Sequence, residues 1–312
     1  MTPHASIDIG TNSTRLLIAE IAADRRVQPV YYQERLTKLG AGLQADGTLT
    51  PESMQRVLEA LTSYKRMISE YHAAPVFVFA TSATRDARNR REFLELIRAQ
   101  TGWRCRVLTG EEEARLSFLG VVSDLNIPNH GVVCDVGGGS SEFIFAQQQQ
   151  MSRVSSLNVG SNRLSRQFLR TDPPSANEIR RARHHIRDCL DTLRMPEEPI
   201  SRLVAVGGTA SSLALMDSNI PIQQPQAAHH YELNSDRLEH LIKKLGGKTH
   251  AERQTLVGLN PQRADVILGG ALIFSEILQK MQHSYMVISL RDLLFGIFLE
   301  QEYDRDPTAK AL

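Results

Sequence analysis

The 312-residue chain is longer than a single hydrophobic core usually serves, so its length favours two domains. Its 36 basic and 35 acidic residues leave a formal net charge of +1, which argues against a nucleic-acid-coating polycation and against an acidic disordered chain. Three scattered cysteines without CxxC spacing argue against a disulfide framework or a structural zinc site. The chain shows no signal-like start and no apolar run of about 20 residues, so we expect a cytoplasmic protein with no membrane partner.

The first half of the chain is predicted to form three strands and then to alternate helices with strands. Branched and aromatic residues predict strands at 5–10, 13–22, 27–36, 75–81 and 104–109. Apolar residues at helical spacing predict helices at 49–71, 85–100 and 111–125. Thr50 and Pro51 are a typical cap and first residue for the first of these helices.

The second half repeats this order after the polar segment 126–131. Strands are predicted at 131–137, 141–146, 152–160, 202–207 and 284–290, and helices at 175–193, 208–216, 234–246, 261–281 and 291–303. The glutamines at 147–150 lie between two strands, which indicates a solvated hairpin turn. We therefore expect two duplicated domains, 1–125 and 126–312, with a cleft between them.

Both halves open with an aspartate followed by small residues, because Asp8 heads the stretch DIGTNS and Asp135 heads DVGGGSS. Glycine lets backbone N–H groups approach an anion closely, while the aspartate suits a hard cation such as Mg²⁺. One such turn is as readily a plain hairpin, but its repetition in both halves favours a metal and phosphate site. A third turn, Gly207–Gly208–Thr209, precedes a helix start that favours anions and is also compatible with ordinary packing.

Neither GxGxxG nor GxxxxGK[ST] occurs, so the dinucleotide fingerprint and the P-loop do not explain these turns. They resemble instead the turns of the actin, sugar-kinase and heat-shock ATPase superfamily. The segments DIGTNSTRLLIAEI, ATSATRDARN, LTGEEEARLSFLGV, DVGGGSSEFIF, LNVGSNRLSRQFL and NPQRADVILGGALI are similar, more specifically, to the exopolyphosphatase and guanosine pentaphosphate phosphatase (Ppx/GppA) family in its short two-domain form.

This resemblance implies an α/β fold of two duplicated ribonuclease-H-like (actin-like ATPase) domains, each a mixed sheet flanked by helices, with an interdomain cleft. It implies Mg²⁺-dependent hydrolysis of the terminal phosphate of inorganic polyphosphate, of guanosine pentaphosphate, or of both, by carboxylate-activated water. Guanosine tetraphosphate is a further expected partner, nucleic acid is not, and a homodimer stays open. The alternatives are an ATP-dependent kinase of the same superfamily and a non-catalytic sensor of guanosine polyphosphates.

The resemblance also assigns site residues. The expected base is Glu113, with Glu112 as the fallback, and the expected catalytic cation is Arg85. The expected metal-site residues are Asp8, Asp135 and Glu142. The expected phosphate-binding residues are Asn12, Ser13, Gly137, Gly138, Gly139, Ser140, Gly208, Thr209, Arg163 and Arg263.

Simpler interpretations accompany several of these assignments. Strand alternation also allows Glu142 a solvated face, and Arg85 can be an ordinary surface cap. The family pattern is broken at Thr84, where a bulky aliphatic residue is expected, and at 291–293, where Arg-Asp-Leu replaces Arg-Glu-Gly. A solvated helix face is predicted for Arg180, Arg181, Arg183 and Arg187. Surface placement rather than metal binding is predicted for the adjacent pairs His184–His185 and His229–His230.

Overall fold

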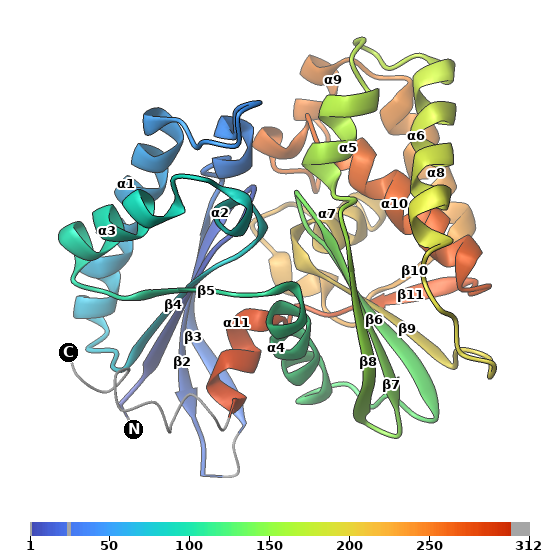
Figure 1. Ribbon diagram of the computed structural model, residues 1–312. Helices are drawn as coiled ribbons and strands as arrows, with labels where there is room; N and C mark the ends of the chain where they lie inside the picture. Colours follow the sequence, from blue (N-terminus) through green and yellow to red (C-terminus); the bar gives the residue numbers. More distant parts are fainter. Residues whose placement is uncertain (1, 24–25, 301–312) are drawn as a thin grey trace. The chain divides into compact units, whose positions relative to one another are not determined.

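The computed structural model describes residues 2–23 and 26–300 (Figure 1). Among these, the residues up to Asp124 and those from Arg291 onward form one compact unit, unit 1, and Leu125–Leu290 form unit 2. Each unit contains one sheet of mixed parallel and antiparallel strands flanked by helices, which confirms the expected fold class. Within the described part of the chain, no helix is both long and apolar enough to cross a membrane.

Unit 1 is built on a five-stranded sheet of order β3-β2-β1-β4-β5. The antiparallel pairs are β1–β2 and β2–β3, and the parallel pairs are β1–β4 and β4–β5. Its strands are β1 His4–Ile9, β2 Thr14–Ile21, β3 Val27–Arg35, β4 Val76–Ala80 and β5 Cys105–Val107. Its helices are η1 Leu39–Gly42, α1 Pro51–Glu70, α2 Ser82–Asp86, α3 Arg90–Thr101, α4 Gly110–Val122, α11 Leu293–Gly296 and η4 Ile297–Leu299.

Side-chain alternation along β1 gives the two faces of this sheet different partners. Ile7 and Ile9 pack into a core with α1 and α3, and the strand residues between them point to the opposite face. That opposite face packs against α4 and α11, where the Ser6 hydroxyl donates to the carbonyl oxygen of Leu294 at 2.9 Å. Asp8 therefore lies on the side of the sheet that α4 and α11 cover.

Unit 2 is built on a six-stranded sheet of order β10-β11-β9-β6-β7-β8. Its strands are β6 His130–Val136, β7 Ser141–Gln147, β8 Gln150–Leu157, β9 Arg202–Val206, β10 Glu232–Asn234 and β11 Tyr285–Ile288. Its helices are α5 Ser161–Phe168, α6 Ala176–Leu190, α7 Gly207–Asp217, η2 Pro225–Ala228, α8 Ser235–Gly246, α9 His250–Gln254, η3 Pro261–Arg263 and α10 Ile267–Lys280. The order β8-β7-β6-β9-β11 repeats β3-β2-β1-β4-β5, so the two halves share the duplicated topology that the sequence predicted.

The hairpin between β7 and β8 confirms the interpretation of the glutamine run. Gln148 and Gln149 form its tip with φ values of 49° and 66°, and their side chains are exposed. The glutamine run therefore serves as a solvated turn, as expected.

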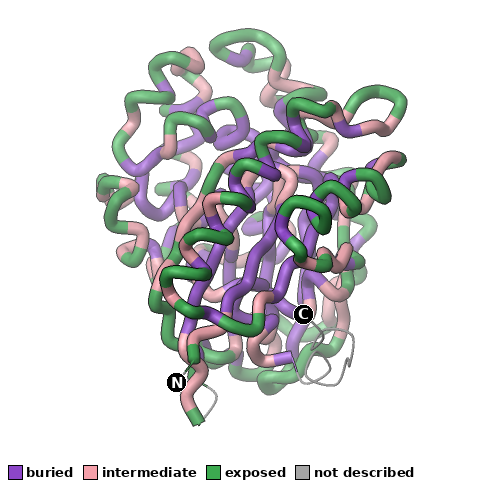
Figure 2. The backbone as a smooth tube through the Cα atoms, turned by 90° about the vertical axis from the view of Figure 1, so that its left-hand side faces the viewer, coloured by how far each residue is buried: buried purple, intermediate pink, exposed green. Residues whose placement is uncertain are grey.

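Buried segments run along the central strands, whereas exposed residues occupy outer helix surfaces and loops (Figure 2).

The closing segment departs from the predicted domain division. Residues after 290 were assigned to the second domain, yet α11 packs against α4 and β1 in unit 1. Gly120 and Gly296 explain this packing, because a Cβ on either would overlap backbone atoms of the other helical segment. The predicted helix 291–303 is reduced to α11 and η4, and its residues 301–303 lie outside the described residues.

Two helices of unit 2 also differ from expectation. The segment after Gly160 was not predicted as a helix but forms α5, and the helix expected from residue 261 begins as the short turn η3 before α10 starts at Ile267. The arginines of α6 do not share one solvated face. Arg183 is only 16% exposed at its side chain and pairs with Glu239 at 2.8 Å and Glu276 at 2.6 Å, so this part of the prediction was wrong.

Candidate active site

The first acid–glycine turn of unit 1 connects β1 to β2. The N–H of Gly10 donates to the carbonyl oxygen of Ser13 at 2.9 Å, and a Cβ on Gly10 would come equally close to that oxygen. The backbone carbonyl of Asn12 accepts from the N–H of Lys38 at 2.8 Å, which fixes the turn against the following loop. The Asn12 side chain is 8% exposed, and its Nδ2 finds no hydrogen-bond partner among the described residues.

Asp8, just before this turn, is 4% exposed and is held by Arg15. Arg15 donates from Nε at 3.0 Å and from Nη2 at 2.7 Å, both to Oδ2 of Asp8. Its third contact, from Nη1, goes to the carboxylate of Asp292. Burial raises the pKa of Asp8, although the neighbouring Arg15 guanidinium opposes this change.

The sequence reasoning missed both Arg15 and Asp292. Arg15 had a usable signal, because it lies directly opposite Asp8 in the antiparallel register of β1 and β2. Asp292 had none beyond its departure from the family pattern, since 277 positions separate it from Arg15.

Arg85 and Glu113 come together in unit 1 from α2 and α4. Nη1 of Arg85 donates to Oε2 of Glu113 at 3.1 Å and to the carbonyl oxygen of Leu108 at 3.0 Å. Glu113 is 8% exposed. The structure thus brings the expected base and the expected cation into direct contact, in a partly buried position where their attraction is weakly screened.

Glu112 has a different environment from its neighbour. Its side chain accepts from the N–H of Thr109 at 2.8 Å and pairs with Arg106, while its own N–H donates to the Thr109 hydroxyl at 3.2 Å. This is a capping box at the start of α4. Burial alone would raise the pKa of Glu112, but the contacts with Thr109 and Arg106 lower it overall.

Asp135 and Glu142 lie opposite each other in unit 2, in the register of β6 and β7. Asp135 is 7% exposed and Glu142 is 1% exposed, so the alternative of a solvated strand face for Glu142 was wrong. Oε1 of Glu142 accepts from the hydroxyl of Ser156 at 2.8 Å. Burial of both acids in one register pair is costly unless cations or donors compensate the charge.

The third glycine turn reaches Asp135 because β9 runs parallel to β6. Gly207 has a φ of 86°, and a Cβ there would lie 2.8 Å from Oδ1 of Asp135. A Cβ on Gly208 would overlap the guanidinium of Arg263, which is 6% exposed and belongs to η3. The hydroxyl of Thr209 donates to the carbonyl oxygen of Val136 at 3.3 Å. The structure thus brings Gly207 against Asp135 and Gly208 against Arg263.

The glycine turn after Asp135 is oriented by α5. The N–H groups of Ser161 and Asn162 donate to the carbonyls of Gly137 and Gly138, both at 2.9 Å, and Nε of Arg163 donates to the carbonyl of Gly139 at 2.9 Å. In a trans peptide the C=O and N–H groups point in opposite directions. The N–H groups of residues 138–140 therefore point away from α5, and successive amides on one side form an anion-binding concavity.

Gly160 permits this docking of α5. A Cβ at this position would lie 2.6 Å from backbone atoms of Gly138 and Gly139. Arg163, predicted as a phosphate ligand, is placed beside the turn and bonds its backbone. Its contact with Gly139 gives it a role in holding the turn.

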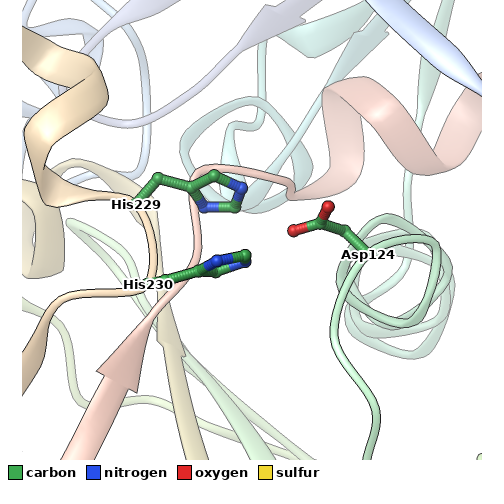
Figure 3. Close-up of side chains that lie close together, drawn as sticks. All are labelled: Asp124, His229 and His230. Carbon is green, nitrogen blue, oxygen red and sulfur yellow. The ribbon is translucent and has the colours of Figure 1, made fainter.

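The histidine pair of unit 2, His229 and His230, lies between η2 and β10. The rings of His229 and His230 stack at 4.0 Å between centroids (Figure 3). Nδ1 of His229 lies 3.2 Å from the N–H of Leu290 and accepts from it. That nitrogen is occupied by the protein backbone.

Asp8 in unit 1, and Asp135 and Glu142 in unit 2, each have the donor chemistry that a hard divalent cation requires. All three are buried carboxylates, the oxygen ligands that Mg²⁺ and similar ions prefer. Within the described residues, Oδ1 of Asp8 has no hydrogen-bond partner although it is buried. A buried carboxylate oxygen without a partner is costly, and a cation would remove that cost.

Comparisons with known proteins agree on one family. The model of the Ppx/GppA phosphatase family matches residues 17–304. Exopolyphosphatase 2 of Mycobacterium tuberculosis is 34% identical over 96% of this chain and 98% of its own length. Exopolyphosphatase 1 of Mycobacterium bovis is 27% identical over 97% of this chain and 89% of its own.

Solved structures give the same result. The crystal structure of the Aquifex aeolicus Ppx/GppA family member has a TM-score of 0.82 at 29% identity and covers 98% of this chain and 99% of that one. An exopolyphosphatase from Cytophaga hutchinsonii has a TM-score of 0.86 at 25% identity, with 96% and 97% coverage. These similarities extend over both units.

Proposed function

Since this chain belongs to the Ppx/GppA phosphatase family, we propose that it removes the terminal phosphate of inorganic polyphosphate, with Mg²⁺ as its metal and water as the nucleophile. The family and its exopolyphosphatase relatives support a phosphate-releasing hydrolase. The identity of the substrate, the metal and the residue roles are the parts proposed here.

The contact between Arg85 and Glu113 carries the proposal. A buried carboxylate can accept a proton from water and direct that water at phosphorus, and a guanidinium can neutralise charge on the phosphate oxygens. The pair at 3.1 Å provides both groups side by side. Glu113 takes the role of base, because Glu112 is committed to the cap of α4.

The phosphate chain would be bound by backbone amides. Residues 138–140 direct their N–H groups away from α5, and the amide of Asn12 and the hydroxyl of Ser13 would supply further donors. Such fixed donors stabilise charge that develops during the reaction without reorganisation. Gly208, which lies against Arg263, and Thr209, which contacts the carbonyl oxygen of Val136, would assist in binding the phosphate chain.

Asp8, Asp135 and Glu142 would hold the metal. When bound, Mg²⁺ would supply positive charge that neutralises the phosphate oxygens. The protein's own contribution would be to hold these carboxylates in buried positions on β1, β6 and β7. One positioned carboxylate, a metal and a cationic group would together be sufficient for hydrolysis of the terminal phosphate.

Phosphate release tests this function directly. Purified protein is given polyphosphates of several lengths and guanosine pentaphosphate, with Mg²⁺ or with a chelator. We expect phosphate from polyphosphate only with the metal present; phosphate from guanosine pentaphosphate as well would add that second substrate. Transfer of phosphate from ATP to an acceptor would identify a kinase instead, and tight binding of guanosine tetraphosphate without any turnover would identify a sensor.

A further inference from the structure

Three charged groups of unit 1 form one closed network around Asp8. Asp8, Arg15 and Asp292 are 4%, 9% and 3% exposed. Arg15 directs two donors to the same oxygen of Asp8, Oδ2, at 3.0 and 2.7 Å, and its remaining contact goes to Oδ2 of Asp292. The network holds two negative charges and one positive charge.

The far end of the network is fixed to the backbone. Oδ1 of Asp292 accepts from the N–H of Leu294 at 3.1 Å, as the cap of α11. The next link is the Ser6 hydroxyl on β1, which donates to the carbonyl of Leu294. Arg15 is therefore held between a strand residue and a helix cap, and its guanidinium has little freedom to turn.

The geometry leaves the two oxygens of Asp8 unequal. Oδ2 is engaged twice by Arg15, whereas Oδ1 is buried without a hydrogen-bond partner among the described residues. A structural ion pair alone would use both oxygens in a fork-to-fork arrangement, which is the favoured geometry of arginine and carboxylate. Here the guanidinium divides its donors between two acids, and Oδ1 of Asp8 is left without a hydrogen-bond partner among the described residues.

We propose that Arg15 and Asp292 are positioning residues, which hold Asp8 by Oδ2 so that Oδ1 is presented to a divalent cation. The inference rests on the proposed function for its metal. Asp292 balances the charge of Arg15, so that Arg15 orients Asp8 without cancelling its attraction for the cation. Groups that orient metal ligands in this way change metal affinity or activity by about 10–100-fold when removed.

Binding of Mn²⁺ to the substrate-free protein, followed by electron paramagnetic resonance, tests the proposal without any turnover. Asp8→Asn should weaken Mn²⁺ binding most. Arg15→Lys keeps the charge but loses the fork, and we expect a Kd about 10-fold higher or more. Asp292→Asn should weaken binding similarly because Arg15 then competes for Asp8, whereas Asp292→Glu, which keeps the charge, should stay closer to wild type.

A buried arginine elsewhere provides the matched control. Arg253 in unit 2 is 5% exposed and donates from Nε to the carbonyl of Leu245 at 2.9 Å, so Arg253→Lys should lower the Tm without changing the Kd for Mn²⁺. Unchanged Mn²⁺ binding in folded Arg15→Lys and Asp292→Asn, with a loss in Asp8→Asn, would overturn the positioning role and leave the proposed function intact. Unchanged binding in Asp8→Asn as well would overturn both this inference and the metal assignment. If Arg15→Lys does not fold, the contrast between Asp292→Asn and Asp292→Glu decides.

Discussion

Adjacent glutamates at the start of α4 show how strongly a side chain's surroundings decide its chemistry. Glu111 is exposed, Glu112 closes the capping box with Thr109, and Glu113 is buried against Arg85. All three are carboxylates within one helical turn. Only the third combines burial with a cationic partner, the combination common at catalytic acids and bases.

Replacing Glu113 separates catalysis from binding. Glu113→Gln keeps the size of the side chain but cannot accept a proton, so kcat should fall by about 10²-fold or more. The affinity for polyphosphate should persist or increase, since one negative charge is removed. Steady-state kinetics and direct binding measurements check both parts.

Its neighbours provide the controls for that experiment. Glu111→Gln should leave kcat nearly unchanged, and Glu112→Gln, which keeps a side-chain acceptor for the capping box, should lose only the favourable charge at the helix start, about 0.3–1 kcal/mol. A near-normal kcat in Glu113→Gln, with a loss in Glu112→Gln, would transfer the role of base to Glu112.

At the scale of secondary-structure elements, α5 acts on the site through the backbone. Its first N–H groups would ordinarily be available to an anion, but they are bonded to the carbonyls of the glycine turn. Because the carbonyls of the glycine turn point towards α5, the N–H groups of residues 138–140 point away from it. In the proposed site, α5 would therefore shape the phosphate-binding turn through the turn's backbone.

Gly160→Ala tests this arrangement. The added Cβ would meet backbone atoms of Gly138 and Gly139 at 2.6 Å, so α5 or the turn must shift. We expect KM for polyphosphate to rise by about 10-fold, the effect of roughly 1.4 kcal/mol lost in binding. Gly247→Ala, whose Cβ would meet Lys243 at an ordinary 3.5 Å, is the control and should leave KM unchanged. An unchanged KM in Gly160→Ala would show that the turn binds phosphate independently of α5.

The capping box of α6 makes a stability contribution that depends on pH. Glu178 accepts from the hydroxyl of Thr171 and from the N–H groups of Arg170 at 2.9 Å and Ser175 at 2.8 Å. These hydrogen bonds, of which the one from Thr171 contributes most, lower the pKa of Glu178 from 4.5 to about 2. The folded-state pKa lies below the unfolded one, so the stabilisation is complete above pH 4.5 and is lost as the pH falls towards 2.

Thermal melts across this pH range measure the effect. Glu178→Gln should lower stability by about 1 kcal/mol at neutral pH, since the group is exposed and screened, and the difference from wild type should shrink as the pH falls through 4. Glu95→Gln, which changes a solvent-exposed pair with Arg91, should show no such trend. A constant difference between wild type and Glu178→Gln at every pH would contradict the assignment.

At the scale of the whole molecule, both units bring buried acids to the end of a central strand. Asp8 is the residue before the last in β1 and Asp135 is the residue before the last in β6, and these strands hold equivalent positions in the two sheets. Because the topology is repeated, each unit carries an aspartate at the equivalent position of its sheet. In each unit the burial of such an acid is costly unless a cation or hydrogen-bond donors compensate its charge.

Metal removal should therefore abolish activity and lower stability together. Excess chelator should stop phosphate release, and Mg²⁺ should restore it. Saturating Mg²⁺ should also raise the Tm, because a ligand at 100 times its Kd adds about 2.7 kcal/mol to the folded state. The Asp8→Asn variant should show a smaller Tm increase. Full turnover in chelator would refute the metal requirement.

Much of the fold could be predicted from local patterns, because strand alternation, helical spacing and caps act within a few residues. The strands around Asp8 and Asp135, the capped start of α1 and the glutamine hairpin were all predicted in this way. Several short motifs together also resembled those of the Ppx/GppA family, and the family model confirms that resemblance. These strands, caps, turns and motifs are determined by residues that are close together in the sequence.

Other features were decided only by tertiary structure. Asp292 reaches Arg15 across 277 positions, α11 joins unit 1 through two close glycines, and Glu142 is buried although its strand pattern allowed a solvated face. Arg183, expected in solvent, is paired with acids from two other helices. Such contacts form only when segments distant in the sequence pack against each other. The burial and ion pairing of a side chain therefore cannot be read from its own segment.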